Sequence, residues 1–118
     1  MTQLKLFLAA LILALTSLSV APAFAGETQI KVSAKNFAFT PSTITLKVHQ
    51  RTRLIFVSNQ GMHGITIPEI GVKNVVNIGK KPSMVEVTPA RTGTFVARCA
   101  VYCGLGHGNM LLTVKVVK

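Results

Sequence analysis

Both cysteines of this 118-residue chain lie in one short stretch near its C-terminus, beside a histidine and a methionine. They follow the spacing Cys-x3-Cys-x3-His-x2-Met, as Cys99, Cys103, His107 and Met110. Thiolate and thioether are soft ligands that suit Cu(I), and imidazole suits copper in either oxidation state. Copper is therefore the first metal to consider for this stretch.

Three other interpretations of these residues are open. Their spacing would also place them on one face of a helix, but glycines at 104, 106 and 108 would each cost a helix interior about 1 kcal/mol relative to alanine. The stretch is therefore expected to be a loop. A simple Cys99–Cys103 disulfide could form in an exported chain. A zinc site with two cysteines and two histidines would leave Met110 without a role.

The stretch from Cys99 to Met110 resembles the copper loop of CuA-type cupredoxin domains, which occur in subunit II of haem-copper oxidases (cytochrome c oxidase) and in nitrous oxide reductase. The run Tyr-Cys-Gly-Leu-Gly-His at 102–107, with Asn109-Met110 after it, is most similar to the short subunit II of b-type oxidases. This family also needs an upstream histidine. His63, in the run Gly-Met-His-Gly-Ile at 61–65, has a similar setting, so the resemblance covers roughly residues 30–118.

The resemblance implies a dinuclear copper centre. Two thiolates would bridge two copper ions, each copper would bind one imidazole, and a thioether and a backbone carbonyl would be the weak ligands. Many family members carry Glu or Gln where this chain has Val101, but the ligand there is the carbonyl. The implied metal ligands are His63, Cys99, Val101 (backbone carbonyl), Cys103, His107 and Met110.

The implied centre relays electrons and catalyses nothing. All its ligand positions are filled by the protein, and the chain has no paired carboxylates or nucleophile–base set. We therefore expect an electron-transfer protein and not an enzyme. Two alternatives remain: a chaperone that delivers copper to an oxidase during assembly, and a mononuclear type 1 carrier that binds one copper through His63, Cys103, His107 and Met110 and leaves Cys99 over.

Residues 1–25 have the pattern of a secretory signal peptide. Lys5 precedes an apolar run from Leu6 to about Val20, and the segment ends in the small-x-small pattern Ala23-Phe24-Ala25. Such a run spans about 22 Å as a helix, less than the roughly 30 Å hydrocarbon core. We expect cleavage after about Ala25 and a periplasmic location. An uncleaved N-terminal membrane anchor is the alternative.

The chain is strongly basic, with 13 Lys and Arg against 3 Asp and Glu and a net charge of +10. Such a charge attracts anionic partners over long range, and salt weakens the attraction. We expect a redox protein partner, a cytochrome or a terminal oxidase, with an acidic docking face, and peripheral contact with an anionic membrane as a further option. Nucleic acid is not expected. Lys73 and the basic turn 79–82 are candidates for the docking surface, although solubility alone would also explain the charge.

Residues 26–118 predict one all-β domain. Runs rich in Val, Ile, Thr and Phe alternate with polar residues and are broken by Gly, Pro and Asn. About eight strands without a convincing helix indicate a Greek-key β-sandwich, as in cupredoxins. The strands that the pattern predicts best are 28–34, 44–48, 53–58, 65–67, 84–88, 94–98 and 110–117.

Three further residues carry expectations. His49 lies among polar residues and is expected in a solvated turn. Met62 precedes His63 and should point to the opposite face of its strand, where we expect it to pack. Met84 begins an alternating run and is expected in the core.

Overall fold

The computed structural model describes residues 27–118, so the predicted signal peptide (residues 1–25) lies outside the described part, and its boundary with the domain stays a prediction. Residues 27–118 contain no helix that is long and apolar enough to cross a bilayer. They form strands joined by short loops and two single-turn 3-10 helices. The elements are β1 (Thr28–Lys35), β2 (Ala38–Thr40), β3 (Thr43–Lys47), β4 (Thr52–Ser58), β5 (His63–Ile67), η2 (Pro68–Ile70), β6 (Val72–Ile78), β7 (Ser83–Val87), β8 (Gly93–Arg98), η3 (His107–Asn109) and β9 (Leu111–Val117).

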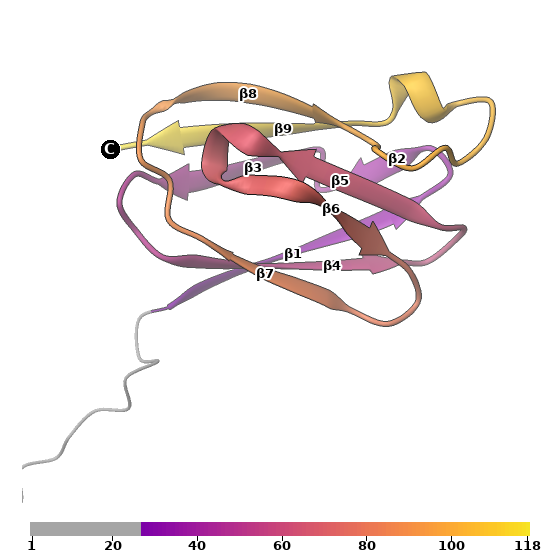
Figure 1. Ribbon diagram of the computed structural model, residues 1–118, viewed down its shortest axis with the longest axis horizontal. Helices are drawn as coiled ribbons and strands as arrows, with labels where there is room; N and C mark the ends of the chain where they lie inside the picture. Colours follow the sequence, from indigo (N-terminus) through magenta and orange to yellow (C-terminus); the bar gives the residue numbers. More distant parts are fainter. Residues whose placement is uncertain (1–26) are drawn as a thin grey trace, which may run out of the picture.

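The strands form a two-layered sandwich (Figure 1). One sheet has the order β2-β1-β4-β7, and the facing layer holds β3-β9-β8. β1 pairs with β4 in parallel, as β3 does with β9, while the other pairs are antiparallel. The hairpin β5–β6 extends the second layer through a bridge between Ile65 and Cys99. The predicted all-β sandwich is confirmed.

Alternating apolar side chains from both layers fill the core. In β4, Thr52, Leu54, Phe56 and Ser58 are buried, and the residues between them are half-buried on the outer face. β9 alternates in the same way, with Leu112, Val114 and Val116 inside as predicted. Because one face of each sheet is covered, this alternation fixes which side chains face inward. The core therefore holds the end loops at set positions.

Two expectations about this part of the chain were incomplete or wrong. The pattern did not predict the three-residue β2, nor β6, in which the exposed Lys73, Asn74, Val75 and Asn77 obscure the alternation of a strand. Met84 is 65% exposed and not in the core. The alternation in β7 is real but has the opposite phase, because Val87 is buried and Met84 therefore points outward.

The neighbours of His63 and the turn before β4 test two more expectations. Met62 is 61% exposed, so it does point away from the buried His63, but it does not pack into the protein as expected. His49 is exposed in the turn after β3, with a positive φ of 62°, as the sequence predicted. The loop with Met62 is thus a surface feature at the end of the sandwich.

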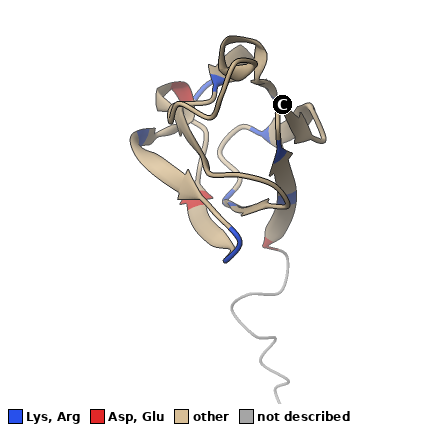
Figure 2. Cartoon of the chain, turned by 90° about the vertical axis from the view of Figure 1, so that its right-hand side faces the viewer, with Lys and Arg blue, Asp and Glu red and all other residues tan. Residues whose placement is uncertain are grey.

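One end of the sandwich carries the loops that contain or adjoin the predicted metal ligands. The β8–β9 loop with η3, the β4–β5 loop and the β6–β7 turn lie together at the right of Figure 1, opposite the start of β1. Seen from that end, Lys and Arg positions, coloured blue on the ribbon, lie at several places around the rim, and the red Asp and Glu positions are few (Figure 2). This end is called the loop end below.

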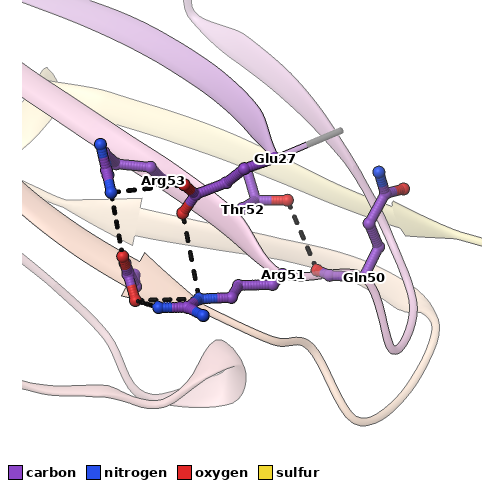
Figure 3. A network of polar contacts seen from close by, with 6 residues as sticks. Glu27, Gln50, Arg51, Thr52 and Arg53 are labelled. Atoms are coloured by element: carbon purple, nitrogen blue, oxygen red, sulfur yellow. Dashed lines mark hydrogen bonds and ion pairs between the residues drawn. The ribbon is translucent and has the colours of Figure 1, made fainter. Parts of the chain in front are cut away.

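An ion-pair network ties together the opposite end (Figure 3). Arg53 contacts both Glu27 and Glu86, at 3.3 and 3.2 Å, and Arg51 donates to Glu86 through Nε at 3.0 Å and through Nη2. The hydrogen bonds from Arg51 and then Arg53 lower the pKa of Glu86, and the same contact raises the pKa of Arg51. The network joins the start of β1 to β4 and β7.

The lowered pKa of Glu86 predicts an acid-dependent contribution to stability. The contribution should be present above the ordinary value of 4.5 and be lost as pH falls through the lower folded-state pKa. Glu86→Gln should therefore lower the urea midpoint of unfolding at pH 7, and the difference from the wild type should disappear at strongly acidic pH. Added salt should shrink the difference at pH 7.

Glu69→Gln is the matched control, because no ion pair within residues 27–118 involves Glu69. An equal effect of Glu86→Gln at pH 7 and at pH 3 would contradict the assignment.

Candidate metal centre

The two cysteines lie next to each other at the loop end. Cys99 directly follows β8, and its N–H donates to the carbonyl of Met110 at 3.0 Å, which closes the base of the β8–β9 loop. Cys103 lies inside the loop, and the two Sγ atoms are 3.6 Å apart. Both cysteines are free; Cys99 is buried and Cys103 is half-buried. The loop thus presents a thiol pair at the end of the core.

His63 approaches this pair from a different part of the chain. It is the first residue of β5 and fully buried. Its Nε2 lies 2.7 Å from the carbonyl oxygen of Gln60. A carbonyl oxygen only accepts, so Nε2 carries the proton, and the lone pair of the neutral ring is on Nδ1. That Nδ1 atom lies 3.9 Å from the Sγ of Cys99.

The other predicted donors surround the same sulfurs. The Nδ1 of His107 lies 3.6 Å from the Sγ of Cys103, and the Sδ of the fully buried Met110 lies 3.8 Å from it. The carbonyl oxygen of Val101 lies 3.1 Å from the Sγ of Cys99. Each thiol thus has one imidazole and one weaker donor beside it.

The spacing of these donors fits metal binding. Atoms that bind one ion at about 2.0–2.3 Å, as nitrogen and sulfur bind zinc, lie roughly 3.3–4 Å apart. The pairs between thiol sulfur and imidazole, thioether or second thiol lie at 3.6–3.9 Å. Donor atoms of His63, Cys99 and Cys103 all lie within 4.8 Å of one another. Soft sulfur and imidazole in one place suit copper.

The thiol of Cys103 is held in its protonated form at neutral pH. Burial raises its pKa from the ordinary 9.0 to about 11, and the hydrogen bond with Cys99 adds to the increase. A metal ion binds the thiolate, so binding at this position must release the proton.

Three contacts that the sequence did not predict hold the loops in place. Phe37 lies under the loop, so close that a Cβ on Gly106 would come within 2.4 Å of its Cγ. The guanidinium of Arg98 donates to the carbonyl of Gly108 at 3.0 Å. The side chain of Val101 lies over Gly64, where an added Cβ would be 2.5 Å from its Cγ2. The glycines at 64, 106 and 108 are visible in the sequence, but the residues that contact them are not.

The structure thus brings together all six predicted ligand residues. They come from the start of β5 and from the β8–β9 loop with the residue that ends it. Their role as metal ligands remains a prediction. The residue that orients His63, Gln60, acts through its backbone carbonyl, which no sequence pattern records.

Comparison with known proteins places the chain in a family. The model of the family described as "Cupredoxin-like domain" matches residues 7–111. The probable cytochrome c oxidase subunit 2 of Streptomyces avermitilis is 36% identical over 75 residues, which are 64% of this chain and 23% of that protein. The cytochrome c oxidase subunit 2 of Candida albicans is 30% identical over 78 residues, 66% of this chain and 29% of that protein. The chain therefore spans only about a quarter of the length of these relatives.

Solved structures agree on the fold. The periplasmic domain of subunit II of cytochrome oxidase (CoxB) of Bradyrhizobium japonicum has a TM-score of 0.69 at 17% identity, covering 77% of this chain and 84% of that one. The reduced auracyanin of Roseiflexus castenholzii has a TM-score of 0.57 at 17% identity, with coverages of 78% and 98%. The chain therefore belongs to the cupredoxin-like family and resembles its CuA-type members in subunit II of cytochrome c oxidase.

Proposed function

We propose that this protein is a periplasmic electron carrier, or a donor resembling oxidase subunit II, whose redox centre is a dinuclear CuA-type copper site. The observation that carries the proposal is the pair of adjacent thiols with one imidazole beside each of them. The related subunit II proteins support copper and electron transfer as the general role. The number of copper ions and the periplasmic location are our inference.

Two ions fit the donor arrangement better than one. A mononuclear centre would use the thiol of Cys103 with both imidazoles and leave Cys99 without a role. Yet Cys99 is buried, lies 3.6 Å from the Sγ of Cys103, and has the Nδ1 of His63 at 3.9 Å. Two copper ions held by both thiolates, both imidazoles, the Met110 thioether and the Val101 carbonyl would give each of these donors a role.

When bound, the copper pair would supply a one-electron redox centre. The chain would hold that centre in a fixed, water-poor site: the carbonyl of Gln60 orients the imidazole of His63, and Met110 and Cys99 are buried. Partners of this kind around a ligand fix its tautomer and tune the metal. A rigid donor set changes little between oxidation states, which favours electron transfer over catalysis.

The partner in this proposal is a cytochrome or terminal oxidase with an acidic face, because the chain carries a net charge of +10. Export depends on the predicted signal peptide at residues 1–25, which the structure does not describe. Delivery of copper to an oxidase is the alternative role for the same ligands. A carrier keeps its copper through repeated redox cycles, and a chaperone surrenders it to a metal-free acceptor.

The Cys99→Ser variant distinguishes a dinuclear copper centre from a mononuclear one. We expect the copper-loaded wild type to hold two copper ions per chain and Cys99→Ser to lose both the stoichiometry and the visible absorption of the site. Elemental analysis and absorption spectra measure these two quantities, and circular dichroism checks that the variant folds. A Cys99→Ser protein that keeps a coloured site with one copper would support the mononuclear alternative.

Copper binding should weaken as pH falls. The raised pKa of Cys103, about 11, means that binding displaces its proton throughout the neutral range. For each proton that binding displaces, the apparent affinity for copper falls about tenfold when the pH falls by one unit. Competition with a Cu(I) chelator between pH 6 and 8, corrected for the chelator's own protonation, measures this slope. An affinity independent of pH would contradict thiolate ligation by Cys103.

The contact of Phe37 with the loop predicts a position-specific effect of alanine. Gly106 has an ordinary φ of −87°, so Gly106→Ala is strained only by its clash with Phe37. We expect it to destabilise the metal-free protein by about 1–3 kcal/mol through overpacking and to weaken copper binding. Chemical denaturation and metal competition measure the two effects.

Gly108→Ala is the matched control, because a Cβ there meets nothing within 4 Å; it should change stability by less than about 0.5 kcal/mol. Removal of the ring by Phe37→Ala should reduce the effect of Gly106→Ala, because it removes the contacts at 2.3 and 2.4 Å and leaves the Cβ of residue 37 at 2.9 Å. Equal effects at 106 and 108, or an effect of Gly106→Ala that is undiminished without the ring, would show that the Phe37 ring does not support the loop.

A further inference from the structure

A surface groove lies at the loop end, beside the loop that supplies His63. It has a volume of about 570 Å³ and runs between the β4–β5 loop and the β6–β7 turn. Its lining residues are Asn59, Gln60, Gly61, Met62, Gly79, Lys80 and Lys81. The groove combines the exposed thioether of Met62 with two lysines, and none of the predicted metal ligands lines it.

The walls of this groove are held rigidly. The N–H of Ser58 donates to the carbonyl of Gly79 at 2.7 Å, which joins the two sides. The hydroxyl of Ser58 lies 2.6 Å from the carbonyl of Gly61 and accepts from the N–H of Gln60 at 3.2 Å. Met62 lies across Gly79, whose missing side chain leaves room for it: a Cβ there would be 3.3 Å from the Met62 Sδ. A partner would therefore meet a preformed surface.

The groove connects directly to the metal centre through one hydrogen bond. Gln60 lines the groove, and its carbonyl accepts from the Nε2–H of His63 at 2.7 Å. The opposite nitrogen of the same ring, Nδ1, faces the Sγ of Cys99 at 3.9 Å. A molecule seated in the groove is thus separated from a predicted copper ligand by a single backbone carbonyl.

The charge at the groove is uncompensated within the described chain. Lys80 and Lys81 are exposed and take part in no ion pair among residues 27–118. Two of the three carboxylates, Glu27 and Glu86, are engaged by arginines at the opposite end. The third, Glu69, lies in η2 and does not line the groove. The groove therefore favours an anionic partner.

A second exposed patch lies on the β8–β9 loop above His107. Tyr102 is 73% exposed, with its ring centroid 5.5 Å from that of His107, and Leu105 is 99% exposed. Residues 99–110 contain no Lys, Arg, Asp or Glu. This patch can contact an apolar surface, and the guanidinium of Arg98 reaches the same loop at the carbonyl of Gly108, 3.0 Å away. The groove carries two exposed lysines and therefore attracts and orients an anionic partner more strongly.

We propose that the groove formed by residues 59–62 and 79–81 is the docking face for an acidic redox protein, one whose exposed cofactor edge is surrounded by carboxylates. The carboxylates face Lys80 and Lys81, the apolar edge contacts Met62, and one electron passes between the partner and the copper centre by way of Gln60 and His63. One protein is oxidised by one electron as the other is reduced, and no proton or bond moves. The inference rests on the proposed function and adds the face through which it operates.

The test measures second-order electron-transfer rates by stopped flow, between the copper-loaded protein and a soluble c-type cytochrome with a carboxylate-ringed haem edge. Lys80→Glu/Lys81→Glu should lower the rate at least about tenfold at low salt and flatten its dependence on ionic strength. Lys47→Glu/Lys115→Glu is the matched control, since both lysines are exposed, lie on β3 and β9 and undergo the same change of charge. It should reduce the rate by only a small factor.

Apolar contact is tested separately. Met62→Asp should slow the reaction with the cytochrome more than Leu105→Asp does. Equal losses in the two lysine pairs would show that net charge alone acts, and a greater loss in Leu105→Asp would place docking on the loop above His107. Either result would overturn the inference.

Copper content and the rate of reduction by ascorbate are recorded for every variant. If the wild type binds no copper pair or is not reduced, the proposed function itself fails. If both are normal and the groove variants react like the control, only the docking face is wrong. A change of sedimentation coefficient with concentration that the Lys80/Lys81 variant abolishes would instead assign the groove to contact between copies of this chain and would also overturn the inference.

Discussion

One backbone pairing makes the site: the contact between the start of β5 and the end of β8. The N–H of Ala100 donates to the carbonyl of Gly64 at 2.8 Å, and Ile65 pairs with Cys99. This pairing places His63 beside Cys99, although 36 positions separate them in the sequence. Gly64 permits the close approach, because the side chain of Val101 occupies the place where a Cβ would lie. Without this register the imidazole of His63 and the two thiols would lie apart.

The two ends of the sandwich are stabilised by different kinds of polar contact. The end with Glu27, Arg51, Arg53 and Glu86 cross-links three strands through ion pairs. The pair of Arg51 with Glu86 is exposed, where such a pair contributes little individually, whereas the side chain of Glu27 is mostly buried. The loop end places buried polar groups close together, each with a partner: His63 with the carbonyl of Gln60 and Cys99 with the carbonyl of Val101. Alternating apolar residues between the ends hold this arrangement in place, and the proposed electron carrier needs such a fixed site.

The sequence was sufficient for the all-β fold class and for the set of residues that meet at the site. The segment from Cys99 to Met110 contains three glycines among its closely spaced candidate ligands, so a loop could be predicted there from the local sequence alone. The upstream histidine was assigned through the resemblance to CuA domains. Most strands were predictable because one face of each is buried and the other is solvated, which produces the period of two.

The features that the sequence left open depend on pairing and on backbone atoms. Alternation in β7 was visible, but its phase was not, and Met84 was therefore assigned to the wrong face. β6 was not predicted, because its exposed polar residues obscure the alternation of buried and exposed positions. The carbonyl of Gln60, the position of Phe37 under Gly106 and the groove beside Met62 arise from the tertiary structure, which brings distant loops together.

The most direct test of the account is electron paramagnetic resonance of the copper-loaded protein in its oxidised form. Two thiolates shared between two copper ions predict a single unpaired electron whose hyperfine coupling is spread equally over two copper nuclei. Hyperfine coupling confined to one copper nucleus, at saturating copper and with both cysteines reduced before loading, would contradict the proposed dinuclear centre.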